Sequence, residues 1–265
     1  MIELKRLLSK KYDFVCSLGS DCGCAGHLVR KHLRRASYPL DWVGTEALGP
    51  ERTAQLVADD FAGFLQLENL RKCEKQPTDD QSDKDHEFYA DIAQHIIFAH
   101  EFPTGRPPEE VYAKVRAKYD RRIARLYETM RQVKSALFVR WSWRESPSED
   151  AILRTAEILR KKFPGRTVDL LAMRNANRPD LDAREIGDGV FLVSGPFHPP
   201  GGHPAFGDKA VNDAVFSCIR LRGKWRETLV RRMVRRCVRL LSLFISDRER
   251  RHAFREKFDK PDVIQ

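Results

Sequence analysis

A cysteine at position 22 stands where a protein can make a thiol reactive. The apolar run 14–18 is typical of a buried strand, and Gly19-Ser20-Asp21 is typical of a tight turn. From Cys22 onward apolar residues recur at helical spacing, so the thiol lies where a helix begins. Unpaired N–H groups and the helix dipole there favour a thiolate. The pattern predicts a nucleophile; the same residues also allow an ordinary turn followed by a small buried cysteine.

Chemistry-bearing side chains also follow the other predicted strands. Ligands of parallel α/β sheets gather at the carboxyl ends of the strands. We therefore expect these side chains to share one edge of a sheet with Cys22. In chain order they are His100 and Glu101, then Trp141, Trp143 and Arg144, then Arg174 and Asn175, then His198 and His203.

Short apolar segments alternate with segments of helical periodicity along the chain. This alternation predicts an α/β fold, with a mainly parallel sheet of about five strands covered by helices. Two polar stretches, 71–87 and 174–188, are predicted to be long loops. The predicted strands are 13–18, 95–99, 136–141, 167–172 and 189–194, and the predicted helices are 22–34, 45–58, 108–133, 148–162, 205–218 and 225–245.

The composition is that of a globular protein: of the 265 residues 42% are hydrophobic and 32% charged. No apolar run has the length of a membrane span, and the N-terminus lacks an apolar signal core, which predicts a cytoplasmic protein. The six cysteines are then expected as free thiols. Cys22, Cys24 and His27 could offer three metal ligands, but they match no strong zinc spacing. We expect neither a metal nor a cofactor.

The net charge of +10 is concentrated near the C-terminus. Residues 220–258 contain 14 Lys and Arg against 4 Asp and Glu, so residues 1–219 are almost neutral. This asymmetry predicts an α/β catalytic domain over 1–219 and a basic amphipathic helical extension over 220–265. We favour an extension docked on the body; the alternative is an extension that binds an anionic membrane surface or a partner. No signature of a nucleic-acid-binding module supports nucleic acid as the partner.

Three passages resemble a bacterial family of unknown function described as papain-like cysteine peptidases. The family pattern looks like Ser-Leu-Gly-x-Asn-Cys, then a helix, then Pro-Phe-Asp-Trp. Here the corresponding passages are 17–22 and 39–42. Residues 97–102 are similar to the family's Phe-x-His-Asp-Phe, and the third passage comprises 119–125 and 137–140. The resemblance covers about residues 13–173.

The resemblance implies a cysteine-dependent hydrolase or acyl transferase with Cys22 as nucleophile and His100 as base. Asp21 replaces the family's usual Asn, and Glu101 replaces its Asp. No motif identifies the group that would orient the imidazole, and Asp41 is our first choice because it lies in a matched passage. Papain itself carries its cysteine on a helix and its histidine on an antiparallel sheet, whereas the periodicity here predicts a parallel sheet.

The substrate implied by the resemblance is a peptide, an acyl compound or a glycan-linked acyl group. Backbone N–H groups near Gly23 and Cys24 would hold its oxyanion. The substrate-binding residues that we expect are Ser20, Asp21, Trp42, Arg140 and Asn175, of which Asn175 is also the second choice for orienting the imidazole.

Two other functions remain open from the sequence. One is a non-catalytic α/β module that binds an anionic sugar or nucleotide through Arg140 or Arg174. The other is an esterase of the Ser-Gly-Asn-His type that would use Ser20 and His203. The esterase pattern lacks the usual Asp three residues before the histidine, where Pro200 stands.

Overall fold

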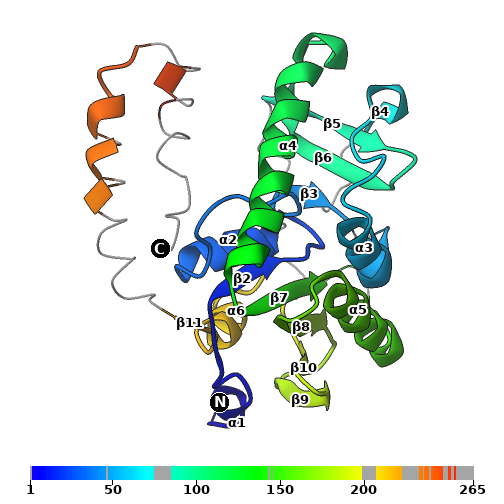
Figure 1. Cartoon of the computed structure of the whole chain (residues 1–265), viewed down its shortest axis with the longest axis vertical. Coiled ribbons are helices and arrows are strands. Elements are labelled where there is room, and N and C mark those ends of the chain that lie inside the picture. Colours follow the sequence, from blue (N-terminus) through cyan, green and yellow to red (C-terminus); the bar gives the residue numbers. More distant parts are fainter. Residues whose placement is uncertain are drawn as a thin grey trace.

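The computed structural model confirms an α/β protein (Figure 1). Its described residues contain a mixed sheet of five strands and an antiparallel sheet of four strands. It describes residues 2–45, 47–74, 85–142, 144, 146–198 and 207–222. In the C-terminal segment it describes 233–234, 236–238, 240–246, 250–251 and 254. None of the helices within these ranges is long and apolar enough to cross a membrane.

The first sheet has five strands in the order β2-β7-β8-β10-β9. Four of them run parallel, and β9 pairs antiparallel with β10 at one edge. The interior strand β7 is buried at every position, as expected for a strand covered on both faces. The strands are β2 (Phe14–Ser17), β7 (Ser135–Ser142), β8 (Thr167–Asn175), β9 (Asp182–Gly187) and β10 (Val190–Gly195).

Helices cover both faces of this sheet. Alternate residues of β7 point to opposite sides, so that Phe138 joins one apolar cluster and Trp141 the other. The first cluster includes side chains of α3 (Gly49–Ala58), α4 (Pro108–Gln132) and α5 (Glu149–Lys162). The second includes side chains of α1 (Ile2–Leu7), α2 (Cys22–Arg30) and α6 (Lys209–Phe216).

The second sheet is antiparallel and has the order β3-β6-β5-β4. Its strands are β3 (Val43–Gly44), β6 (Ile96–Pro103), β5 (His86–Asp91) and β4 (Leu70–Cys73), and a short 3-10 helix, η1 (Leu67–Asn69), precedes β4. The α4 helix packs on it, since the Phe98 ring of β6 lies edge-on to Tyr119 of α4 at 5.5 Å between centroids. Phe98 and Phe138 belong to one apolar cluster, so this sheet and the five-stranded sheet share a core.

The expected mainly parallel sheet is therefore not confirmed, because the five-stranded sheet is mixed and the second sheet is antiparallel. The segment predicted as a strand at 95–99 belongs to the antiparallel sheet. The two stretches predicted as loops also contain strands, namely parts of β4 and β5 in the first and β9 in the second. Of the helix predicted at 225–245, residues 233–234, 236–238 and 240–242 are helical, and 225–232, 235 and 239 lie outside the described residues. The predicted boundary between 1–219 and 220–265 stays a prediction.

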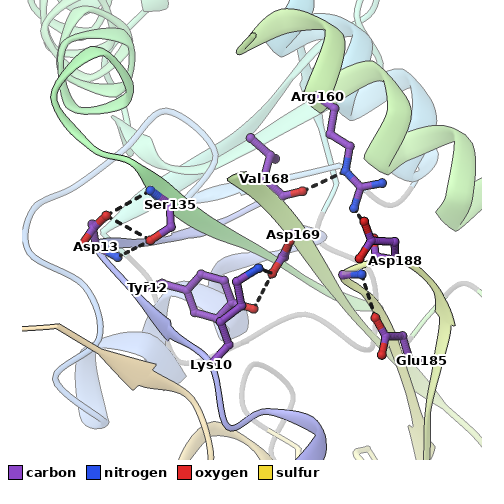
Figure 2. A network of polar contacts seen from close by, with 10 residues as sticks. Lys10, Tyr12, Asp13, Ser135, Arg160, Val168, Asp169, Glu185 and Asp188 are labelled. Atoms are coloured by element: carbon purple, nitrogen blue, oxygen red, sulfur yellow. Dashed lines mark hydrogen bonds and ion pairs between the residues drawn. The ribbon is translucent and has the colours of Figure 1, made fainter. Parts of the chain in front are cut away.

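A polar network joins the strands at the amino ends of the five-stranded sheet (Figure 2). The buried Asp169 carboxylate on β8 accepts hydrogen bonds from Lys10 Nζ and from the Tyr12 hydroxyl, both at 2.7 Å. Burial, followed by the Asp169 carboxylate, raises the pKa of Tyr12 far above its usual value. Tyr12 lies in β1 (Lys11–Tyr12), which pairs with β11 (Arg220–Leu221). The network therefore lies at the end of the sheet opposite to the one where the Cys22 turn follows β2.

Candidate functional site

The turn that leads to Cys22 is built around a glycine that no other residue replaces easily. Gly19 has a φ of +89°, a conformation that residues with a Cβ rarely adopt. A Cβ at this position would clash with Thr45 Oγ1 and lie 2.8 Å from Arg140 Nη1. The backbone of the turn thus packs directly against two polar side chains.

Arg140 is the side chain that fixes this turn. It projects from β7, is 1% exposed, and donates from Nη1 to the Leu18 carbonyl at 2.8 Å and to Thr45 Oγ1 at 2.8 Å. The same Nη1 reaches Thr53 Oγ1 at 3.3 Å, and Nη2 donates to the Thr45 carbonyl at 3.1 Å. We expected Arg140 to bind substrate; its buried position and these contacts describe a positioning residue.

Ser20 is also enclosed by the fold. Its side chain is fully buried, and Oγ donates to the Trp141 carbonyl at 2.8 Å. Its own carbonyl accepts the Thr45 N–H at 2.6 Å. These contacts tie β2 to β7 and to the segment after β3, and they give the hydroxyl no access to a substrate. His203, its partner in the esterase alternative, lies outside the described residues.

Cys22 is the first residue of α2 and is partly exposed. Cys16 and Cys24, in contrast, are fully buried, and burial raises the pKa of both thiols, that of Cys24 to about 12. Asp21 caps the helix, because its Oδ1 accepts the Gly23 N–H at 2.7 Å. This cap occupies one of the N–H groups that we expected to hold an oxyanion.

We expect Asp21→Asn to make Cys22 more reactive. Asparagine caps a helix as well as aspartate does, so α2 should keep its N-terminus. The substitution removes a negative charge beside the thiol and so favours the thiolate. Because nucleophilicity falls as thiolate stability rises, the alkylation rate near neutral pH should increase only about two- to fivefold. Alkylation quenched at timed intervals, followed by peptide mapping, measures the rate at Cys22. An unchanged or slower rate would contradict the electrostatic role of Asp21.

His100 lies in an irregular part of β6. Glu87 pairs with Phe102 and Tyr89 with Phe98, so that three residues of β6, 99–101, face the single Phe88 of β5. Such bulges redirect side chains and are frequent next to active sites. His100 thus lies between Phe98 and Phe102, whose side chains are buried in the core.

Glu101 anchors the bulge to α4. Its buried carboxylate contacts Lys118, accepts the Tyr119 hydroxyl at 3.0 Å and lies 3.7 Å from Arg122 Nη1. Burial, followed by the charge of Glu101, raises the pKa of Tyr119 well above its usual value. The residue next to His100 is therefore held by three side chains of one helix.

His86 is a candidate that the sequence analysis missed, because it fell in a stretch predicted to be a loop. Its ring lies edge-on to that of His100, with 6.2 Å between centroids and 85° between planes. It also lines a hollow of about 500 Å³ at the edge of the antiparallel sheet. The sequence signal was the apolar pair Phe88-Tyr89, followed by a turn and the apolar residues of β6. The lining residues are Lys72, Cys73, Glu74, His86, Glu87 and Phe88.

Contacts through β3 bring the Cys22 turn and the His100 strand to one region. The Thr45 N–H binds the Ser20 carbonyl, two residues before Cys22. Directly before Thr45, Val43 and Gly44 form β3 and pair with Phe98 and Ile97 of β6, two and three residues before His100. A single short segment thus pairs with β6 and hydrogen-bonds the turn that leads into α2.

Asp41 makes contacts that do not involve an imidazole. Its fully buried Oδ2 accepts Arg34 Nη1 at 3.0 Å and the Tyr38 N–H at 2.7 Å. Burial raises the pKa of this carboxyl, and the Arg34 charge opposes that shift. The Arg34 guanidinium also lies 5.1 Å above the Trp42 ring. Asp41 and Trp42 are thus both engaged by Arg34.

Asn175, the other candidate for orienting the imidazole, ends β8. Its Oδ1 accepts the His198 N–H at 2.9 Å, and its Nδ2 donates to the His198 carbonyl at 3.3 Å. The amide therefore fixes the backbone after β10. Within the described parts of the chain, no three His, Cys, Asp or Glu side chains form a group that could hold a metal ion.

Comparisons with known proteins place these features in context. A family model described as "Putative papain-like cysteine peptidase (DUF1796)" matches residues 13–170. Among curated proteins, the chain is similar to "Uncharacterized protein R408" of Acanthamoeba polyphaga mimivirus, with 31% identity over 134 residues. That match covers 47% of this chain and 59% of the viral protein. No solved structure gives a significant match.

Proposed function

The chain belongs to the family described as "Putative papain-like cysteine peptidase", and from this premise we propose a cysteine-dependent hydrolase or acyl transferase. In this proposal Cys22 is the nucleophile and His100 is the general base. The family match supports the class of chemistry; the two residues and their roles are our own assignment.

The arrangement of secondary structure supports this assignment. Cys22 begins a helix and His100 lies in an antiparallel sheet, which are the elements that carry the cysteine and the histidine in papain. The observation that carries the proposal is the connection through β3 and Thr45, which joins the turn before Cys22 to the strand of His100. Cys22 also differs from the buried Cys16 and Cys24 in being partly exposed.

The reaction would run through an acyl-enzyme. A ring nitrogen of His100 takes the Cys22 proton, and the thiolate electron pair forms a bond to the substrate carbonyl carbon. The carbonyl π electrons move to oxygen, and the N–H groups of the first turn of α2 stabilise that oxyanion. The Gly23 N–H would first have to leave the Asp21 carboxylate. When the oxyanion collapses, the leaving group departs with the His100 proton, and water or another acceptor then attacks the thioester.

The substrate would be a peptide, an acyl compound or a glycan-linked acyl group. The hollow beside His86 is our candidate for the side on which part of the substrate binds, because His86 contacts His100. His86 is also a candidate for positioning the His100 ring. Asp41 and Asn175 support this role less well, since their observed contacts go to Arg34, Tyr38 and the His198 backbone.

Alkylation by iodoacetamide at about pH 6.5 tests the proposal, because few ordinary thiols are ionised at that pH. We expect Cys22 to be labelled faster than Cys237, although Cys237 is more exposed. The buried thiols, whose pKa values burial raises, should stay unlabelled in the folded protein: Cys16, Cys24 and Cys218. Peptide mapping by mass spectrometry gives the rate at each position.

A matched pair of histidine variants shows whether the imidazole matters. His100→Asn should slow the labelling of Cys22, while His95→Asn, in the exposed turn between β5 and β6, should leave it unchanged. If Cys22 reacts no faster than Cys237, or if both variants behave alike, the proposed thiol–imidazole pair is wrong.

A further inference from the structure

Most of the exposed large apolar side chains of the described residues lie in one short segment. Eight such side chains are exposed, and six of them fall between residues 233 and 244. Phe244 is 88% exposed, whereas the described residues of the body contribute only Val29 and Ile92. Surfaces of this kind mark interaction sites. The six are Met233, Val234, Leu240, Leu241, Leu243 and Phe244.

This segment buries two of its described side chains and exposes most of its apolar ones. Val238 and Ser242 are buried, and they lie four residues apart, as neighbours on one side of a helical turn. In Figure 1 the segment, coloured orange, lies beside the body and apart from α4 and both sheets. The six exposed apolar side chains are thus not covered by the body, as docking on it would require.

The same part of the chain carries the positive charge. Residues 220–258 contain 14 basic and 4 acidic residues, and Arg236 and Arg250 are among its exposed side chains. An interfacial membrane segment requires apolar side chains next to many arginines. The apolar side chains enter the acyl region, and the arginines contact anionic headgroups. A second copy of this chain fits less well, because two such segments would repel each other.

We propose that residues 233–244 form a surface that binds anionic lipid membranes. Leu243 and Phe244 insert at the boundary between headgroups and acyl chains, and the flanking arginines hold the segment at a negatively charged leaflet. Nucleic acid would attract the arginines but would give the exposed leucines no apolar surroundings. Membrane binding by this surface does not depend on the proposed chemistry at Cys22.

Vesicle sedimentation with the full-length protein tests the proposal. We expect the protein to sediment with phosphatidylserine-containing vesicles at low salt and to stay in solution with pure phosphatidylcholine. Raising the salt to about 0.5 M should weaken binding several-fold, because the Debye length falls to a few ångströms. The double variant Leu243→Glu/Phe244→Glu should lower the partition coefficient at least about tenfold, since it places two charges in the apolar boundary.

Matched controls test whether the binding comes from this surface alone. Ile92→Glu changes an exposed apolar residue of the body and should bind vesicles as the natural chain does. A melting temperature equal to that of the natural chain shows that each variant is folded. The proposal is overturned if anionic and neutral vesicles bind equally, if neither binds, or if the double variant binds normally. Size-exclusion chromatography with light scattering would overturn it in favour of self-association if the natural chain is a dimer and the double variant is a monomer.

Discussion

Replacing Arg140 by methionine should lower the free energy of unfolding by about 3–5 kcal/mol, because the change leaves several buried acceptors without their donor. The Leu18 and Thr45 carbonyls and the Thr53 hydroxyl all receive hydrogen bonds from this guanidinium. Methionine keeps most of the volume, so the loss reports the hydrogen bonds rather than a cavity. For a chain of this size the melting temperature should fall by roughly 6–15 °C.

The same variant should also slow the alkylation of Cys22, since Arg140 holds the turn 18–20 that leads into α2. Arg144→Met is the matched control, because Arg144 is an exposed arginine four residues further along. Its effect on stability should stay within about 0.5 kcal/mol. An Arg140→Met protein that melts within about 2 °C of the natural chain would show that the buried guanidinium contributes little.

Replacing Cys22 by alanine should abolish thiol-dependent turnover. An activated ester such as p-nitrophenyl acetate should acylate the natural protein, and mass spectrometry should find the acetyl group on Cys22. Without the nucleophile, the rate above buffer should fall on the order of a thousandfold or more. In the His100→Asn variant the rate above buffer should fall by roughly a hundredfold to ten-thousandfold, which is the usual contribution of a general base.

Cys24→Ala is the control for this experiment. Cys24 lies on the same helix two residues away, is fully buried, and places its thiol 3.4 Å from the Val139 carbonyl. Its removal should leave the acylation rate within about threefold of the natural value, since its raised pKa keeps the thiol protonated near neutral pH. If Cys24→Ala is as inactive as Cys22→Ala, or if neither change matters, Cys22 is not the nucleophile.

The strands that the sequence predicts well are those buried on both faces. β2, β7, β8 and β10 are nearly continuous apolar runs, and the helices around them have clear periodicity. β4, β5 and β9 were missed because their half-exposed positions carry charged residues, which resemble a loop in composition. The β6 strand was predicted, but its antiparallel pairing was not. The pairing depends on β5 and β3, and nothing in the sequence of β6 itself indicates it.

The candidate site shows the same division between local and tertiary information. The position of Cys22 at a helix N-terminus follows from local pattern, and the structure places it there. Arg140 was expected to bind substrate, but its carbonyl and hydroxyl partners come from segments roughly 90–120 residues away in the chain, which local pattern does not reveal. His86 was missed because it fell in a stretch predicted to be a loop, and its contact with His100 arises only when β5 pairs with β6.

The position of β10 has a practical consequence for anyone cutting this chain. The family match ends at residue 170, in the middle of β8, and β10 pairs with β8 from Val190 to Gly195. A fragment trimmed to 13–170 would leave the buried strand β7 without its β8 partners from Val139 to Ser142, and such an unpaired edge is a template for edge-to-edge aggregation. Expression trials should therefore keep at least β10 and α6, and insolubility of the shorter fragment would say nothing about its chemistry.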